Sequence, residues 1–205
     1  NGNAVYIQPS DWACNAWKIL GGHSYIPIKT LPFPVEIERF KPLNNVNKTE
    51  VFIYFKRRKP SELNFIKKFL NNKKISYKIF DYVNKYKEVD YIQCLQNAKF
   101  GIVVDAHESQ GFAIEEALSC NVPLIVWNVT FMSQEEGANY PNIPCSNISY
   151  WDERCGEFFY REEEFEDTYN KFMSKIDTYN PREYILEHLS PEKCSERLVE
   201  LINSY

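Results

Sequence analysis

The sequence predicts an α/β fold in which helices cover both faces of a doubly wound parallel sheet. Short apolar runs alternate with stretches whose apolar residues recur at helical spacing, as in repeated strand–helix–strand units. The run 51–55 is apolar throughout, which is typical of a strand buried on both faces. The chain has 205 residues, enough for one sizeable domain with an appended piece.

The first part of the chain has the pattern of a small separate unit. A strand at 4–8 is followed by a helix that Ser10 or Asp11 would cap and that Gly21-Gly22 would end. A second strand follows at 25–30, and two prolines then break it. We expect a hinge in the polar stretch 44–48, so that residues 1–43 precede a main domain over residues 44–205.

The main domain alternates strands and helices in a regular order. We expect strands at 51–55, 75–80, 100–104, 124–127 and 156–160, and helices at 61–70, 89–98, 112–119, 162–176, 182–188 and 191–202. The last helices form a C-terminal helical tail. Ser61 is expected to cap the first helix of this series. Ligands of such sheets bind outside the carboxyl ends of the strands, so the loops after residues 55, 104 and 127 are the candidates.

Composition argues against several classes of protein. The formal net charge of -4 gives no support for a nucleic-acid partner. No apolar run approaches the about 20 residues of a membrane span, and no apolar signal region follows the first residues. The six cysteines form no C-x-x-C pair, which favours reduced thiols. We therefore expect a cytoplasmic protein.

Four consecutive cations follow the first strand of the main domain. They are Lys56, Arg57, Arg58 and Lys59, and Pro60 comes next. A diphosphate at this position would meet basic side chains together with the N-terminus of a helix. A solvated basic loop and a nuclear-localisation-like run are the alternatives. The position at the carboxyl end of a strand favours phosphate binding.

A second loop of unusual chemistry follows the strand at 100–104. It contains His107, Glu108, Ser109, Gln110 and Gly111, and a helix over 112–119 comes after it. Gly111 would allow a tight turn and a close approach of the backbone to a ligand. The amides from Gln110 through Phe112 to Ala113 would then point at a phosphate or a sugar hydroxyl. Glu116, one turn into the helix, would accept hydroxyls of a ribose; the alternative is a solvated helix residue.

The stretch from Glu108 to Glu116, followed by Ala117-Leu118-Ser119-Cys120-Asn121-Val122-Pro123-Leu124-Ile125-Val126, resembles the E-x(7)-E motif of retaining GT-B glycosyltransferases. The resemblance is greatest to family 4, the glycosyl transferases group 1. It implies a Rossmann-like donor domain that binds a nucleoside-diphosphate sugar. It also implies transfer to an acceptor hydroxyl with retention and without a metal or other cofactor.

The resemblance also implies roles for particular residues. Glu108 would contact the donor sugar, and Glu116 would bind the ribose. A basic pair after the first strand would hold the diphosphate, and it aligns with Lys56, Arg57 and Lys59 or Arg58. The glycine that usually precedes this arginine is absent here, so the sequence leaves the working cation open.

The connector at 31–42 is similar to the family's P-x-G-V-D-x-x-x-F-x-P, with Pro34 in place of Gly and Glu36 in place of Asp. Residues 1–43 would then be the end of the acceptor-side domain. Either that domain is very reduced, or the rest of it lies outside this chain. The acceptor would be a glycan or a lipid-linked molecule. The alternatives are a non-catalytic nucleotide-sugar-binding module and a sugar-nucleotide epimerase on the same fold.

Other chemistries have little support in the sequence. There is no D-x-D, no G-x-G-x-x-G and no P-loop, and the three histidines lack the spacing of metal ligands. We therefore expect no metal site. His107 is interpreted as a structural residue or as a substrate contact. The lysines at 67, 68, 73 and 74 are interpreted as a solvated face or as a peripheral contact with an anionic membrane.

Overall fold

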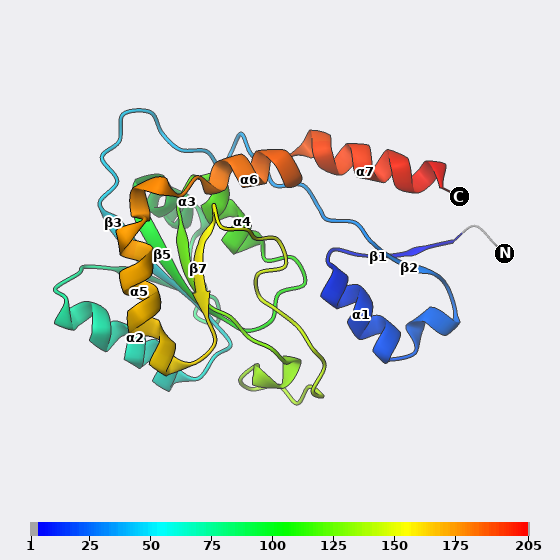
Figure 1. The fold of residues 1–205 in the computed structure, drawn as a ribbon, viewed down its shortest axis with the longest axis horizontal. Helices are drawn as coiled ribbons and strands as arrows, with labels where there is room; N and C mark the ends of the chain where they lie inside the picture. The colour runs from blue at the N-terminus through cyan, green and yellow to red at the C-terminus, as the bar shows by residue number, and fades with distance from the viewer. Residues whose placement is uncertain (1–3, 205) are drawn as a thin grey trace.

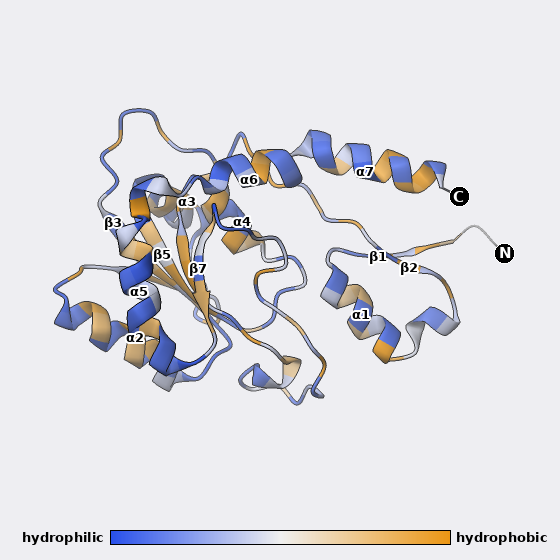
Figure 2. Ribbon diagram, viewed as in Figure 1, coloured by the Kyte–Doolittle hydropathy of each residue, from blue (hydrophilic) through white to orange (hydrophobic). Residues whose placement is uncertain are grey.

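The structure is a computed structural model that describes residues 4–204. Figure 1 shows a main body built around one sheet, with a small N-terminal unit beside it. Figure 2 shows the strands of the sheet as mainly hydrophobic and the helices around it as mixed, with hydrophilic residues along them. No helix in the described part of the chain is long and apolar enough to cross a membrane.

The main sheet has five parallel strands, which confirms the predicted fold class. In chain order they are β3 (Glu50–Lys56), β4 (Lys78–Asp81), β5 (Ala98–Asp105), β6 (Leu124–Trp127) and β7 (Gly156–Phe159). Their order across the sheet is β4-β3-β5-β6-β7. The chain first builds outwards from β3 to β4 and then returns to place β5 on the other side of β3. The carboxyl ends of β3 and β5 therefore form the switch point at which such sheets bind ligands.

Two helical layers cover the sheet. One layer contains α2 (Pro60–Asn72) and α5 (Phe165–Ser174), and the other contains α3 (Glu88–Asn97), α4 (Phe112–Ser119) and α6 (Pro181–His188). Side chains of β3 alternate between the two cores: Phe52 faces α3 and α4, whereas Ile53 faces α2 and α5. Both are fully buried, and each such side chain contributes roughly 1.5–3 kcal/mol to folding.

Several boundaries differ from those predicted. Helix α2 begins at Pro60 with Lys59 as N-cap, so Ser61 is not the cap. Proline suits this first position because the amide it lacks would have no partner in the helix. Strand β4 begins at Lys78, three residues later than expected, after a turn in which Lys74 has a φ of 58°. The helix expected at 162–176 is shorter: a 3-10 helix, Glu162–Glu164, precedes α5, and a second 3-10 helix follows it at Ile176–Thr178.

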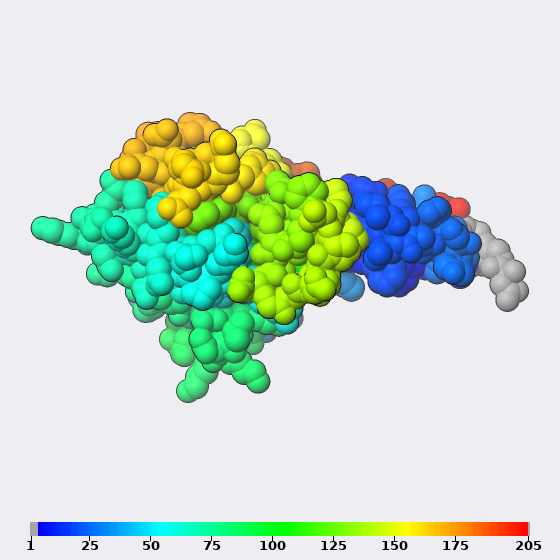
Figure 3. All heavy atoms as spheres, turned by 90° about the horizontal axis from the view of Figure 1, so that it is seen from below, coloured from blue at the N-terminus to red at the C-terminus, as the bar shows by residue number. Residues whose placement is uncertain are grey.

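The N-terminal unit pairs β1 (Tyr6–Gln8) in parallel with β2 (Ile28–Thr30), with α1 (Asp11–Ile19) and a 3-10 turn at Gly22–Ser24 between them. The space-filling view in Figure 3 shows this unit in blue, next to the yellow-green loop that follows β6. A 3-10 turn at Met132–Gln134 interrupts that loop. The chain ends in α7 (Pro191–Asn203), which leaves the body close to the N-terminal unit in Figure 1.

The connector between the two parts is fixed to the main domain by hydrogen bonds. The amide of Val35 donates to the carbonyl of Leu189 at 2.9 Å. The Arg182 guanidinium donates to the carbonyl oxygens of Ile37 and Phe40 at 3.2 and 3.1 Å. The connector therefore lies along α6 and α4 and brings the N-terminal unit to the carboxyl edge of the sheet.

Candidate functional site

A cavity of about 600 Å³ lies at the switch point between β3 and β5. Strand β3 contributes Tyr54 and Lys56, and the start of α4 contributes its first turn. The loop after β4 adds Tyr82, Lys85 and Tyr86. The cavity thus has an aromatic side formed by tyrosines and a polar side formed by two lysines, several carboxyl groups and backbone amides.

The polar side is organised around Lys56. Its ammonium forms an ion pair with Glu108 and lies 4.6 Å from the centre of the Tyr82 ring. Burial alone would lower the pKa of Lys56, but Asp105 and Glu108 together outweigh burial and raise the pKa above its ordinary value. The raised pKa keeps Lys56 positively charged inside the cavity.

Asp105, at the end of β5, is the second carboxyl group near Lys56. It is buried, and one of its oxygens has no hydrogen-bond partner among the described residues. Burial and then the neighbouring Glu108 raise the pKa of Asp105 well above its ordinary value. Two carboxyl groups thus lie near one lysine, and burial beside Glu108 favours the protonated form of Asp105.

The N-terminus of α4 forms the floor of the cavity. Gly111 is its N-cap with a φ of 95°, a left-handed conformation that favours glycine. The amides of Phe112 and Ala113 lie in the first turn, where a helix offers them no internal acceptor, and both residues line the cavity. Such a helix start is a general anion-binding feature.

Glu116 lines the same cavity one turn further along α4. No hydrogen bond or ion pair involves its carboxyl group within residues 4–204. Burial, followed by repulsion from Glu88, raises the pKa of Glu116 to about 8. This carboxyl group is therefore partly desolvated and has open hydrogen-bonding capacity, as a group that binds ligand hydroxyls would require.

Arg57, the cation that follows Lys56, lies outside the first cavity. Arg57 pairs with the buried Glu135 at 2.7 Å, and its side chain is about half exposed. Glu135 also approaches Nδ1 of His107 at 3.3 Å, and burial lowers the pKa of His107 below its ordinary value. The loop after β6 thus meets the loop after β3 through Arg57 and Glu135.

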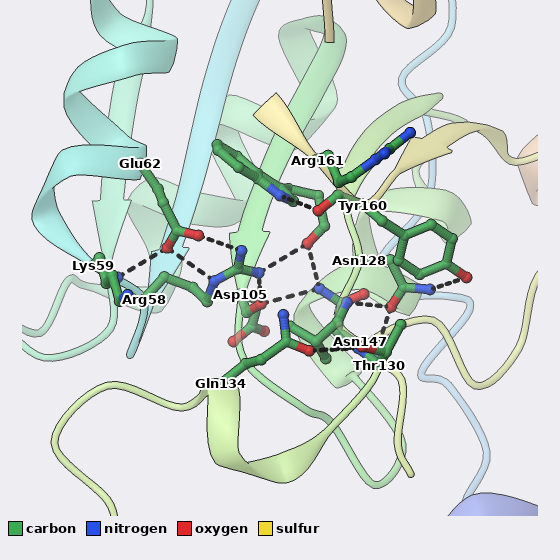
Figure 4. Close-up of polar contacts among 12 residues, drawn as sticks. Arg58, Lys59, Glu62, Asp105, Asn128, Thr130, Gln134, Asn147, Tyr160 and Arg161 are labelled. Carbon is green, nitrogen blue, oxygen red and sulfur yellow. Dashed lines mark hydrogen bonds and ion pairs between the residues drawn. The ribbon is translucent and has the colours of Figure 1, made fainter. Parts of the chain in front are cut away.

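Arg58 is buried, and its side chain makes structural contacts. Figure 4 shows these polar contacts. Its guanidinium donates to the carbonyl oxygens of Asp105 and Trp127 at 2.9 and 3.1 Å, and it pairs with Glu62 at 2.6 Å. The side-chain amide of Asn147 donates to the same two carbonyls, at 3.1 Å each. These bonds hold the ends of β5 and β6 together and fix the edge of the sheet on which the cavity is built.

A second cavity of about 340 Å³ lies between the main domain and the N-terminal unit. Trp12 and Trp17 of α1 line one side, and Arg57, His107 and Tyr140 line the other. Lys56 and Glu108 line both cavities, so their ion pair stands at the boundary between the two.

The structure distributes the residues expected from sequence over these two cavities. Six of them meet in the first cavity: Lys56, Glu108, Gly111, Phe112, Ala113 and Glu116. Arg57 and Ser109 line the second. Lys59 and Gln110 line neither: Lys59 caps α2, and the Gln110 side chain bonds to the amide and the carbonyl of Phe33 at 2.9 and 2.6 Å.

Sequence reasoning missed the aromatic side of the first cavity. Tyr82, Lys85 and Tyr86 follow the strand expected at 75–80, but that loop was not among the candidates. The available signal was its position, because it also leaves the carboxyl end of a parallel strand. As to metals, residues 4–204 contain no cluster of three or more His, Cys, Asp or Glu side chains suited to hold an ion.

Comparison with known proteins gives a consistent result for the fold. No family model and no curated protein sequence matches the chain. Among solved structures, a mutant of TarM from S. aureus in complex with fondaparinux, α-GlcNAc-glycerol and UDP is similar over 96% of this chain and 43% of its own, with a TM-score of 0.63 and 13% identity. The lipopolysaccharide outer core galactosyltransferase WaaB is similar over 97% and 62%, with a TM-score of 0.62 and 13% identity.

A sucrose-phosphate synthase from Thermosynechococcus elongatus has a TM-score of 0.62 at 12% identity, over 99% of this chain and 59% of its own. The likeness is one of fold. The chain has the Rossmann-like arrangement found in GT-B glycosyltransferases. It spans between 43% and 62% of the length of these three structures.

Proposed function

We propose that this chain supplies the donor site of a glycosyltransferase, which moves a sugar from a nucleoside-diphosphate sugar to an acceptor hydroxyl. The observation that carries the proposal is the first cavity. It joins a charged lysine, the open N-terminus of α4 and the unpartnered carboxyl group of Glu116 around about 600 Å³. Similar folds among glycosyltransferases, one of them in complex with UDP, support it.

The parts of the donor match the parts of the cavity. The diphosphate would lie between Lys56 and the amides of Phe112 and Ala113, where positive charge and free N–H groups converge. The ribose hydroxyls would bind Glu116, about one helical turn away. The base would then lie on the aromatic side, against Tyr82 and Tyr86.

Catalysis would depend on the charge that develops on the departing diphosphate. Lys56 and the α4 amides are held in place before the reaction, so they stabilise that charge without reorganising. Arg57, beside the boundary of the two cavities, would add to this stabilisation of the charge. Glu108 and Ser109 would orient hydroxyls of the transferred sugar. From the resemblance of the E-x(7)-E stretch to family 4, we propose retention and independence from metal.

Calorimetric titration with UDP, GDP and ADP tests the donor site. We expect one nucleotide to bind with a micromolar to millimolar dissociation constant, unchanged by EDTA. Lys56→Met and Glu116→Ala should each weaken nucleotide binding by about 1–3 kcal/mol, because each removes a hydrogen-bonding partner of the nucleotide. Lys59→Ala, which removes a neighbouring cation outside the cavity, is the matched control and should leave affinity unchanged.

If Lys59→Ala weakens nucleotide binding as much as Lys56→Met does, the cations act as a general basic surface and the proposed site is wrong. A non-catalytic nucleotide-sugar-binding module is the second candidate, because the first cavity would supply the binding groups for a nucleotide whether or not transfer follows. Turnover of the preferred sugar nucleotide, measured as release of the nucleoside diphosphate, separates the two. Binding without turnover favours the module.

A further inference from the structure

Asp105 is a buried carboxyl group to which the proposed function assigns no role. It ends β5 directly opposite Lys56 in the pairing of β5 with β3, and it lines the first cavity. The residue is 1% exposed, and one of its carboxyl oxygens has no hydrogen-bond partner among the described residues. The ion pair of Lys56 is with Glu108. An ionised Asp105 would therefore lack the donors that a buried charge needs.

Glu108 is the acidic neighbour of Asp105, and its backbone is held in place. Its carbonyl accepts hydrogen bonds from Nε1 of Trp12 and Oγ of Ser149 at 3.0 and 3.1 Å. Its amide donates to the carbonyl of Ser146 at 3.1 Å. Burial raises the pKa of Asp105, and Glu108 raises it further through its charge and through a proton that the two carboxyl groups share. The two groups therefore remain neighbours when a ligand enters the cavity.

The other titratable and charged groups around Asp105 leave this proton in place. Tyr54 of β3 and Tyr86 of the loop after β4 stay neutral, because burial raises the pKa of both, that of Tyr86 to about 12. Arg58 donates to the main-chain carbonyl of Asp105 at 2.9 Å. Lys56 lowers the pKa of Asp105, but burial and Glu108 outweigh it.

We propose that Asp105 is a positioning residue that shares a proton with Glu108, and that nucleotide binding in the first cavity depends on this proton. The proposal rests on the proposed function, because it takes this cavity as the donor site. A diphosphate there attracts the ammonium of Lys56. The O–H group of Asp105 then donates to Glu108 and keeps its carboxylate directed at hydroxyls of the transferred sugar. Without the proton, Asp105, Glu108 and the diphosphate would place three negative groups around one ammonium.

The proton and the nucleotide are thus linked ligands. If the proton strengthens nucleotide binding, the nucleotide must strengthen proton binding by the same factor. Nucleotide affinity should therefore fall as the pH rises and Asp105 ionises in the free chain. Asp105→Asn mimics the protonated form, because its amide is neutral at every pH and still donates, whereas Asp105→Ala removes the donor.

The test is a calorimetric titration with UDP between pH 6.5 and pH 9.5. Burial raises the pKa of Glu116 to about 8, within this range, so the parent chain carries Glu116→Gln, whose amide oxygen still accepts ribose hydroxyls. We expect Asp105→Asn to match the parent at pH 6.5 and to bind UDP about fivefold or more tighter than the parent at pH 9.5. The ratio of the two affinities removes the ionisation of UDP itself.

Two further variants complete the comparison. Asp105→Ala should bind UDP about fivefold or more weakly than the parent at pH 6.5, because Glu108 then has no donor in place of Lys56. Asp167→Asn changes an exposed carboxyl group of α5 and is the matched control. It should follow the parent at every pH.

Carbon-13 NMR of the aspartate carboxyl groups provides a measurement that needs no nucleotide. The resonance that Asp105→Asn removes belongs to Asp105, and we expect it to titrate well above pH 4, which is about the ordinary pKa of an aspartate. If UDP does not bind the wild-type chain, the proposed function fails and the link to the nucleotide fails with it. Titration well above pH 4 would then still support the shared proton.

Three results would overturn the proposal. Titration of Asp105 near pH 4 would remove the shared proton, whether or not UDP binds. If Asp105→Asn binds UDP as weakly as Asp105→Ala does at pH 6.5, the ionised carboxylate is the form that supports binding. If the ratio of affinities between the parent and Asp105→Asn stays constant from pH 6.5 to pH 9.5, the proton and the nucleotide are not linked.

Discussion

At the scale of single residues, the four consecutive cations at the end of β3 have four different environments. Lys56 lines the first cavity, Arg57 lines the second, Arg58 is buried in the framework, and Lys59 caps α2. The sequence predicts a basic loop at the carboxyl end of a strand, and the structure has one. Which cation faces a ligand could not be predicted, because it depends on carbonyl and carboxyl groups from β5, β6 and α2.

Arg58→Ala should be strongly destabilising. It would leave Glu62 and the carbonyl oxygens of Asp105 and Trp127 without their donor, so we expect a loss of about 3–5 kcal/mol in the free energy of unfolding. Urea unfolding followed by circular dichroism measures this loss. Lys59→Ala is the control and should change stability by less than about 0.5 kcal/mol. Equal effects of the two substitutions would contradict the framework role of Arg58.

The two adjacent glutamates of α4 should make the stability of the fold depend on pH. Burial raises the pKa of both Glu115 and Glu116 to about 8, from 4.5 in the unfolded chain. The folded state therefore binds more protons than the unfolded state between pH 4.5 and 8, and stability falls as pH rises through this window.

Glu116→Gln should remove part of this dependence. The variant should match the wild-type chain near pH 4.5 and be more stable than it by about 1–3 kcal/mol above pH 8, since the amide does not ionise. Thermal unfolding at a series of pH values tests this. A wild-type chain whose stability rises across the same pH window, with Glu116→Gln unchanged, would contradict the raised pKa.

At the scale of elements, patterns of hydrophobicity predict the fold best where strands are fully buried. Strand β6 and helix α4 have the bounds expected from sequence, because each is flanked by clear turn residues and has an apolar core. The start of β4 and the N-cap of α2 were predicted less well. There the chain turns through Lys74 in a left-handed conformation and begins a helix at a proline, and neither event leaves a periodic signal.

The N-terminus of α4 provides the test at this scale. Gly111 and Gly137 both have positive φ angles, of 95° and 79°. Alanine at either position should cost about 1–2 kcal/mol in stability from backbone strain alone. Only Gly111→Ala should also weaken nucleotide binding, because only Gly111 directs amides into the first cavity. Denaturant unfolding and calorimetry on both variants measure these effects, and equal nucleotide affinities would argue against an anion site at α4.

At the scale of the whole molecule, the side chain of Gln110 joins the main domain to the connector. It bonds to the amide and carbonyl of Phe33 and to the carboxyl group of Glu115 at 3.0 Å. Gln110→Ala should lower stability by about 1–3 kcal/mol, because buried partners would lose their bonds. It should also speed proteolytic cleavage near residues 31–42. The exposed Ser109→Ala is the control, and identical digestion of the two variants would contradict this role.

The central claim is that a nucleoside diphosphate binds between Lys56 and the start of α4. Amide chemical shifts of the ¹⁵N-labelled chain, recorded during titration with UDP, test it most directly. We expect the largest shifts at Phe112 and Ala113, smaller ones at Lys56 and in the loop after β4, and little change in α5 and α7. Shifts concentrated in α5, α7 or the exposed lysines of α2, with none at the start of α4, would contradict the account.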